Sequence, residues 1–410
     1  MNSILFTEKK LNNNLEIKNR FVKAAMNEAM GNKYLQPKEE IIRLYETWAK
    51  GGTGLIITGN VMVDPNYLAE PGNIVFDKNS NKELLRKWSD AGRVNGSKIV
   101  VQINHPGKQA PKTVSKNPVA PSAVPIVGEI GNLFNKPREL SGEEIKDLVQ
   151  KFALAAKIAY QTRFDGVEIH AAHGYLINQF LSPFDNRRKD EYGGSIDNRM
   201  RFLHEIYLAM REVTSKDFAI GLKINSSDFK EGGFSEEDSM YVIEKMDKSG
   251  IDFIEVSGGS YENPKMNEST SKNKNSVFFA DYSKKIKEKI NAPVIVTGGI
   301  RTVDSMVELI ENDYSDFIGL ARPLAIEPNI PNLIAKNRYQ TIETKRLSTG
   351  IKSLDKKLGG LIGLVYYQLL MQTYGKGQKP KITQNAWPAL IHSVWHQGLA
   401  ALLPQRVKEK

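Results

Sequence analysis

The sequence predicts a (β/α)8 barrel of the TIM type with an appended C-terminal helical extension. The first observation is that eight apolar runs of strand length alternate with amphipathic helical stretches over about 340 residues. The second is that one run ends directly in a cluster of titratable side chains, as strands of parallel barrels do at active sites. A doubly wound open sheet alternates in the same way. However, it usually has fewer strands than eight, and no G-x-G-x-x-G motif follows a strand here.

The elements can be placed in chain order. Residues 3–18 are expected to form a short hairpin or lid ahead of the first strand. Strands are expected at 20–26, 54–60, 98–103, 166–170, 218–224, 253–256, 293–297 and 317–320. Helices are expected at 38–50, 82–96, 141–163, 197–213, 235–248, 279–290, 302–311 and 329–337. Ser141 with Glu144 three residues later is a capping box, which supports the start of the third helix.

The alternation ends near residue 345, so we divide the chain into a barrel domain at 1–344 and an extension at 345–410. Helical spacing of apolar residues returns at 358–373 and 386–403, on either side of the basic stretch GKGQKPK. The extension has eleven basic and two acidic residues, which accounts for nine of the ten net positive charges. The barrel is therefore nearly neutral, and its composition is not that of a nucleic-acid-binding protein.

Three interpretations of the extension remain open. It packs against its own barrel or a partner subunit in a homo-oligomer, which we favour. It lies on an anionic membrane surface, because Trp387 and Trp395 fall on one apolar stripe beside lysines. It binds another protein.

The composition excludes several classes of site. The chain has no cysteine, which excludes disulfides, thiolate nucleophiles and cysteine-ligated metal or iron–sulfur centres. The N-terminus lacks a signal-peptide pattern, and no apolar run reaches the roughly 18 residues of a membrane span. We therefore expect a cytoplasmic protein.

The titratable cluster follows the fourth strand and contains His170, His173 and Tyr175. A His-x-x-His pair can bind a metal, but no patterned carboxylate accompanies this one, so no metal site is predicted. Two histidines in a core are also common. Together with a phenol that can deliver a proton, two imidazole donors suit the polarisation of a carbonyl oxygen and the reduction of an activated alkene.

Glycines and an arginine follow the last two strands. Gly298 and Gly299 end the seventh strand, and Gly319 to Arg322 end the eighth. Barrels often bind phosphate at these positions, through backbone N–H groups and a forked guanidinium. Glycines also simply mark turns, but this placement favours a phosphorylated ligand.

Two polar side chains lie at the ends of other strands. Lys223, at the end of the fifth strand, either forms a Schiff base, places a positive charge beside a cofactor, or makes a structural salt bridge with Glu168. Gln102, at the end of the third, offers a donor and an acceptor to a planar heterocycle, although such an amide often has no ligand.

Long motifs carry a family resemblance. The run GVEIHAAHGYLINQFLSP, followed by NRRKDEYGGSIDNRMRF, resembles the signature region of the Old Yellow Enzyme family of FMN-dependent ene-reductases. The resemblance extends over residues 1–340, with NRFVKAAM, GLIITGN, VQINHPG, PVIVTGGI and IGLARP.

The resemblance implies a bound FMN, reduced by NADH or NADPH, and an electron-poor alkene as substrate. His170 and His173 match the pair that binds the substrate carbonyl, and Tyr175 matches the proton donor. The residues that match cofactor-binding positions are Ala25, Met26, Asn27, Gln102, Lys223, Gly298, Gly299, Ala321 and Arg322. Asn186, Arg188, Asp190, Tyr192 and Arg199 match the signature loop, where we expect scaffolding.

This sequence departs from the family at Asn27, where many relatives have Thr or Cys over the flavin. The absence of cysteines argues against the larger branch with an iron–sulfur cluster. Two alternative functions remain: reduction of a quinone or other small oxidant, and a flavin-holding interaction protein that acts through its extension. A Schiff-base aldolase is less favoured than both.

Overall fold

Eight parallel strands form a closed barrel in the computed structural model, which describes residues 3–128, 131–259, 279–344 and 346–397. The strands, in order around the barrel, are β3 (Phe21–Lys23), β4 (Leu55–Ile57), β6 (Lys98–Asn104), β9 (Gly166–Ala171), β10 (Ala219–Asn225), β11 (Phe253–Ser257), β12 (Val294–Thr297) and β13 (Phe317–Leu320). β13 pairs with β3 in parallel, which joins the last strand to the first. The (β/α)8 prediction is confirmed, with all eight strands at their expected places.

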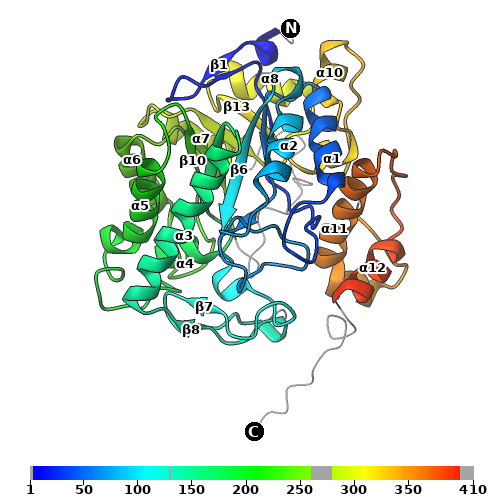
Figure 1. Ribbon diagram of the computed structural model, residues 1–410. Coiled ribbons are helices and arrows are strands. Elements are labelled where there is room, and N and C mark those ends of the chain that lie inside the picture. The colour runs from blue at the N-terminus through cyan, green and yellow to red at the C-terminus, as the bar shows by residue number, and fades with distance from the viewer. Residues whose placement is uncertain (1–2, 129–130, 260–278, 345, 398–410) are drawn as a thin grey trace.

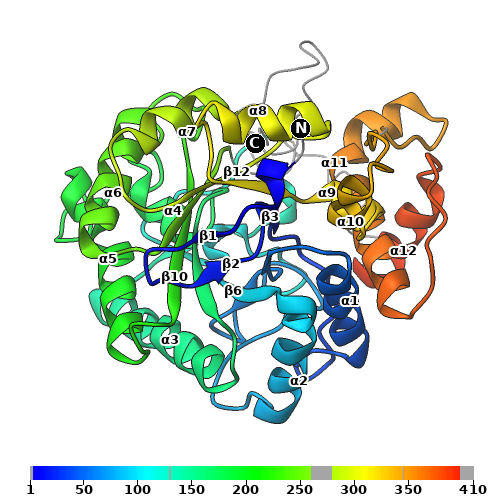
Figure 2. The ribbon, with the colours of Figure 1, turned by 90° about the horizontal axis from the view of Figure 1, so that it is seen from above.

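Helices surround the strands (Figure 2). They are α1 (Glu39–Lys50), α2 (Lys82–Gly92), α3 (Gly142–Gln161), α4 (Leu176–Leu181), α5 (Ile196–Glu212), α6 (Glu236–Ser249), α7 (Ala280–Lys287), α8 (Val303–Glu311), α9 (Arg322–Ile326) and α10 (Ile330–Ala335). The predicted capping box begins α3: the Glu144 N–H donates to Ser141 Oγ at 3.2 Å, and the Ser141 N–H donates to Glu144 Oε2 at 2.9 Å. The expected helix at 82–96 ends at Gly92, because Asn95 adopts a left-handed conformation with φ of 59°.

The remaining strands are short and lie outside the barrel order or at its edge: β1 (Lys9–Lys10), β2 (Glu16–Ile17), β5 (Val61–Met62), β7 (Val119–Ala120) and β8 (Arg138–Glu139). β1 and β2 form the expected hairpin, at the opposite end of the barrel from β7 and β8 (Figure 1). Asn12 and Asn13 of this hairpin donate to the carbonyls of Ile251 and Asp217, just before β11 and β10. The hairpin therefore closes the N-terminal end of the barrel and leaves the C-terminal end for the site.

Alternate residues of the strands fill the barrel interior. The layer nearest the hairpin is apolar and fully buried, with residues from seven strands and the hairpin: Leu11, Ile17, Val22, Leu55, Ile57, Val100, Ala219, Phe253, Ile295 and Phe317. Gly221 is required here, because a Cβ at this position would lie 2.1 Å from the Phe253 ring. Further toward the C-terminal ends, the inward positions become polar.

The extension consists of α11 (Lys352–Gly375) and α12 (Trp387–Gln397). α11 begins six residues before the expected start at 358, and the expected end of the second helix at 403 lies outside the described residues. α11 lies beside α1 (Figures 1 and 2), and its C-terminus is held by a bond from Arg43 Nε to the Gly375 carbonyl at 2.9 Å. Ile362, Val365, Leu370 and Leu390 form a small core with Ile326 of α9. The extension thus packs against its own barrel.

Candidate active site

Two histidines and a tyrosine lie together at the C-terminal end of β9. The His170 ring centroid is 5.1 Å from that of His173 and 4.9 Å from that of Tyr175. His170 lies within β9, whereas His173 and Gly174 adopt left-handed conformations with φ of 61° and 77°. This sharp turn brings His173 and Tyr175 back beside His170.

Both imidazoles are neutral. Burial lowers the pKa of His170 and of His173 well below the usual range, and the positive charge of Lys223 acts in the same direction. The Ala172 N–H donates to His170 Nδ1 at 3.3 Å, so the His170 proton resides on Nε2, which is then a donor. His173 is held by Ser257 Oγ, 2.7 Å from its Nε2, and by Asn225, which accepts from its backbone N–H.

A buried group of charged and polar side chains lies beneath this trio. Lys223 Nζ is 2.8 Å from Glu255 Oε1, and Gln102 Nε2 donates to Glu168 Oε2 at 2.7 Å. Burial, together with the charge of Glu255, raises the pKa of Glu168 well above its usual value. Glu168 is therefore protonated while Glu255 carries the charge that pairs with Lys223.

The salt bridge of Lys223 is thus with Glu255 and not with Glu168, because β10 pairs with β11 in a register that sets Lys223 directly opposite Glu255. The Lys223 Nζ is engaged by the Glu255 carboxylate, whereas a Schiff base requires a free amine that can attack a carbonyl. This geometry argues against the aldolase alternative.

Backbone donors and two arginines gather after β12 and β13. Gly298 and Gly299 have φ of 132° and 77°, and their N–H groups and that of Ala321 donate to no acceptor in the described chain. Burial lowers the pKa of Arg322, and the nearby charge of Arg301 lowers it further. Within the described residues neither guanidinium has a carboxylate partner, so the donors and charge of this region fit a phosphate group.

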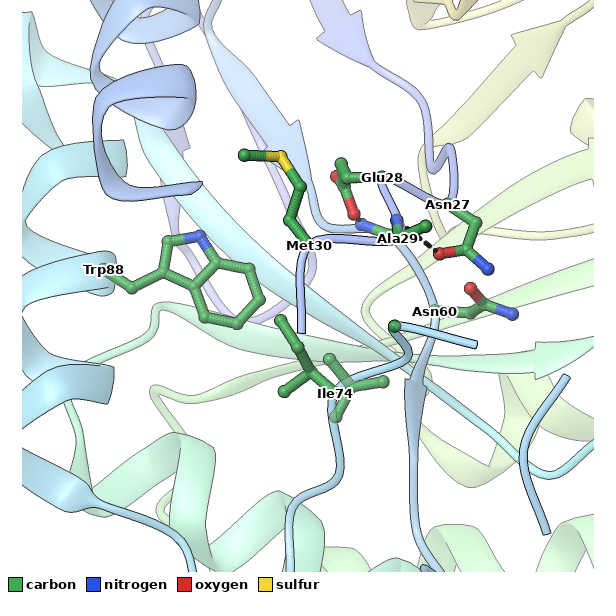
Figure 3. A pocket seen from close by; sticks show the side chains of 10 residues that line it. Asn27, Glu28, Ala29, Met30, Asn60, Ile74 and Trp88 are labelled. Carbon is green, nitrogen blue, oxygen red and sulfur yellow. Dashed lines mark hydrogen bonds between the residues drawn. The ribbon is translucent and has the colours of Figure 1, made fainter. Parts of the chain in front are cut away.

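The segment after β3 contains Ala25, Met26 and Asn27, which are all half-buried. Asn27 Oδ1 accepts from the Ala29 N–H at 3.1 Å. A small cavity lies beside this segment, and Figure 3 shows the Asn27 amide close to that of Asn60, with Trp88 on the opposite side of the cavity. This cavity has a volume of about 10 Å³, the space of about one water molecule. It is therefore too small to be the site of a cofactor or substrate.

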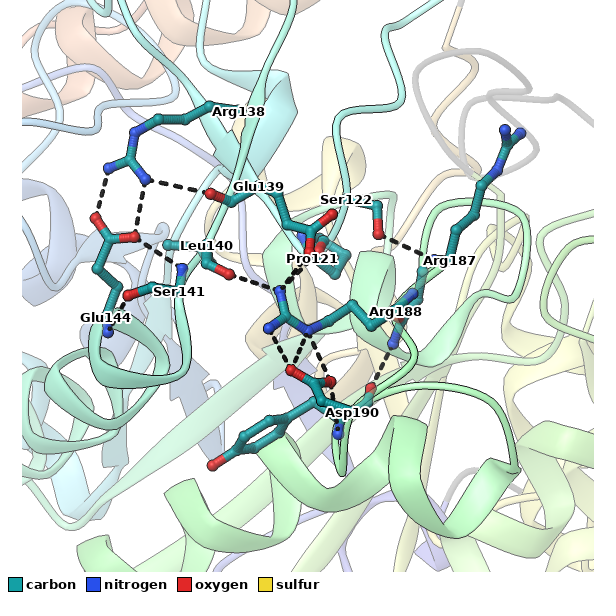
Figure 4. Close-up of polar contacts among 12 residues, drawn as sticks. Pro121, Ser122, Arg138, Glu139, Leu140, Ser141, Glu144, Arg187, Arg188 and Asp190 are labelled. Atoms are coloured by element: carbon teal, nitrogen blue, oxygen red, sulfur yellow. Dashed lines mark hydrogen bonds and ion pairs between the residues drawn. The ribbon is translucent and has the colours of Figure 1, made fainter.

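The loop after α4 is held by internal bonds. Arg188 lies at the centre: it forms an ion pair with Asp190 at 2.5 Å and donates to the carbonyls of Pro121 and Leu140 at 3.0 and 2.6 Å (Figure 4). Asn186 donates to the carbonyls of Phe180 and Tyr192. Tyr192 and Arg199 pair with Glu205 and Asp238, so the contacts of these five residues hold the loop in place.

Comparison with known proteins identifies the chain. A family model described as the NADH:flavin oxidoreductase / NADH oxidase family matches residues 5–341. The chain belongs to the Old Yellow Enzyme family.

Members of this family with related sequences come from fungi and bacteria. The NADH-dependent flavin oxidoreductase iliE of Hypocrea jecorina is 37% identical over 351 residues, which cover 79% of this chain and 86% of that protein. The NADH oxidase of Thermoanaerobacter brockii is 34% identical over 373 residues, which cover 90% of this chain and 55% of that protein.

Solved structures of the family have the same fold. A 2-naphthoyl-CoA reductase complex superposes with a TM-score of 0.77 at 26% identity, covering 82% of this chain and 53% of that chain. Morphinone reductase superposes with a TM-score of 0.70 at 23% identity, covering 82% and 91%, a likeness of fold alone. This chain spans about half the length of the naphthoyl-CoA reductase and of the T. brockii oxidase.

As an Old Yellow Enzyme family member, the protein is an NAD(P)H-dependent, FMN-containing oxidoreductase. Its own residues fit that cofactor, because the N–H groups after β12 and β13, which have no acceptor among the described residues, and the nearby arginines match a phosphate group. Among the described residues, no group of His, Asp and Glu side chains is arranged to hold a metal ion. None of the described helices has the length and apolar character to cross a membrane.

Three residues at or near the site were not predicted from the sequence. Arg301 joins Arg322 after β12, Glu255 pairs with Lys223, and Gln368 of the extension reaches Glu70 behind the first-strand segment. Arg301 directly follows the Gly-Gly-Ile stretch, a position that could have marked it as a second phosphate-binding charge. Gln368 gave no comparable signal.

Proposed function

We propose that this protein reduces the activated C=C bond of an α,β-unsaturated carbonyl compound, with Tyr175 as the proton donor. The observation that carries the proposal is the clustering of His170, His173 and Tyr175 at the open end of the barrel. Neutral imidazoles can donate N–H groups to a carbonyl oxygen, which withdraws electrons from the alkene. The Tyr175 hydroxyl can then deliver a proton to the carbon next to the carbonyl.

The residues that would hold the FMN lie around this cluster. Ala25, Met26 and Asn27 would line one side of the cofactor and Gln102 and Lys223 another. Its phosphate would be held by Gly298, Gly299, Ala321 and Arg322. When bound, FMN supplies the hydride that it has taken from NADH or NADPH. The Lys223–Glu255 pair keeps one positive charge fixed in the barrel interior, where it can stabilise negative charge on a neighbouring ligand.

A substrate panel tests the proposed reaction. The purified holoenzyme is assayed without oxygen, using NADH or NADPH, with enones, quinones and the saturated ketones that match the enones. We expect turnover of enones, with the saturated ketones inert, because the ketones bind through the same oxygen but lack the alkene. Efficient quinone turnover with no enone reduction would instead support the small-oxidant alternative.

Arg322→Ala tests the phosphate site. We expect the variant to bind FMN about 10- to 100-fold more weakly, since a charge-assisted bond contributes about 1.5–3 kcal/mol, while riboflavin, which lacks the phosphate, binds unchanged. Isothermal titration of the apoprotein measures both affinities. Arg338→Ala, at an exposed arginine beyond α10, is the matched control and should change neither. Equal losses for FMN and riboflavin would place the phosphate elsewhere.

A further inference from the structure

The middle of α11 reaches the back of the segment that follows β3. Gln368 Nε2 donates to Glu70 Oε2 at 2.8 Å, and both residues are buried, with exposed fractions of 4% and 8%. One turn further along, Gln372 Nε2 donates to the Glu28 carbonyl at 3.4 Å. The C-terminal extension therefore contacts the barrel directly behind Asn27.

Glu70 is held in place by its own loop. The side chain of Asn73 accepts from the N–H groups of Ala69 and Glu70 at 2.8 Å each, which turns the Glu70 side chain inward. The carboxylate accepts a hydrogen bond from the Gln368 amide, and the Asn27 amide lies close enough to lower the pKa of Glu70. Glu70 thus receives a bond from a residue of the extension that lies 298 positions later in the sequence.

The orientation of the Asn27 amide follows from these contacts. Its Oδ1 accepts from the Ala29 N–H, at a turn where Ala29 has φ of 52°, and the same amide interacts electrostatically with the Glu70 carboxylate. Rotation of the Asn27 side chain would break the bond to Ala29 and move the amide away from Glu70. Displacement of Glu70 would therefore remove one of the two interactions that orient the Asn27 amide.

We propose that Gln368 is a positioning residue of the flavin site, which holds Glu70 and through it fixes the Asn27 side chain and the charge behind it. This rests on the proposed placement of Asn27 against the cofactor. The extension is then part of the oxidoreductase site as well as a covering for the outside of the barrel.

The charge behind Asn27 changes near neutral pH. Burial raises the pKa of Glu70 to about 7, against the opposing effect of the Gln368 hydrogen bond and of the nearby Asn27 amide. The charged group that faces Glu70 is Glu28, which also raises this pKa and is itself bonded to Lys23 and Tyr45. Because the Glu70 charge forms as the pH rises through this value, it should make bound FMN harder to reduce above neutral pH than below it.

The test is the midpoint potential of bound FMN, titrated from pH 5.5 to 8.5. For the wild-type protein we expect the plot of midpoint potential against pH to change slope near pH 7, as Glu70 gains its charge. We call this change of slope the break. Gln368→Leu removes one hydrogen bond to the carboxylate, so the break should move upward by about one pH unit or more. Glu70→Gln keeps the shape of the side chain but removes the charge, so the break should disappear.

Tyr374→Phe is the matched control on the same helix. The Tyr374 hydroxyl donates to the Ile326 carbonyl at 2.7 Å and anchors α11 to α9 without touching Glu70. This variant should show the wild-type break even if its melting temperature falls as much as that of Gln368→Leu. Equal potentials in all four proteins at every pH would overturn the proposal, as would an equal shift in Gln368→Leu and Tyr374→Phe.

Failure of this inference is distinct from failure of the proposed function. The potentials depend only on bound FMN, so they can be measured whether or not an enone is reduced. If Gln368→Leu does not fold, Glu70→Gln still tests the inference. A break that persists in Glu70→Gln would rule out Glu70 as its source.

Discussion

Replacing Tyr175 with phenylalanine is expected to slow enone reduction by about 10²- to 10⁴-fold, the usual contribution of a positioned general acid. Reduction of the cofactor by NADH, which requires no proton from Tyr175, should change little. The two half-reactions can be separated by stopped-flow absorbance, with NADH mixed first and the enone second. Substrate affinity should also be nearly retained, because His170 and His173 would still bind the carbonyl oxygen.

Tyr192→Phe provides the control for this variant. It makes the same change in the following loop, where the Tyr192 hydroxyl donates to Glu205 Oε2 at 3.0 Å. Both half-reactions should keep their rates in this protein. If Tyr175→Phe reduced enones as fast as Tyr192→Phe, Tyr175 would not be the proton donor and another acid would have to be sought.

Replacing Arg188 with alanine is expected to lower the free energy of unfolding by about 2–4 kcal/mol, mainly because two carbonyls lose a buried donor, at about 1–3 kcal/mol each. The ion pair adds less than a fully buried pair would, because the Asp190 side chain is 36% exposed. The Arg188 side chain is 5% exposed, and its loss would leave the carbonyls of Pro121 and Leu140 without this donor and the Asp190 carboxylate without its cation. Arg188 lowers the pKa of Asp190, so this contribution is present at neutral pH and is lost in acid, as Asp190 becomes protonated. Urea unfolding at saturating FMN measures the change.

Arg138→Ala is the matched control, drawn beside Arg188 in Figure 4. Arg138 also bonds a carboxylate with both terminal nitrogens, at 2.8 and 2.6 Å from Glu144, but its side chain is 50% exposed. Water replaces such a partner readily, so the expected loss is about 1 kcal/mol or less. Equal losses in the two variants would show that burial does not set the strength of the Arg188 pair.

The fold was predictable because each barrel strand is a short, continuous apolar run followed by an amphipathic helix. The sequence did not indicate α4, because Leu176–Leu181 is only six residues long, which is too short to show a helical repeat of apolar residues. α9 was missed for the same reason, since it has five residues. Both helices are fixed by contacts with the barrel and not by their own propensity.

The part of the site that could be predicted consists of residues that are close together in the sequence. His170, His173 and Tyr175 lie within six positions, so the end of one strand places them side by side. The partner of Lys223 was not predictable, because it depends on which residue of β11 lies opposite. The Gln368–Glu70 bond could not be predicted either, because its two residues are 298 positions apart in the sequence. They come together only through the complete fold of the barrel.

The pairing of β13 with β3 has a consequence for synthesis of the protein. No shorter nascent chain can complete the sheet, because the last strand ends at Leu320 and must find a partner that left the ribosome about 300 residues earlier. Throughout elongation, the edges of the incomplete sheet remain available to other chains. Yield in a heterologous host should therefore depend on chaperone supply and on translation speed more than on the final stability of the folded enzyme.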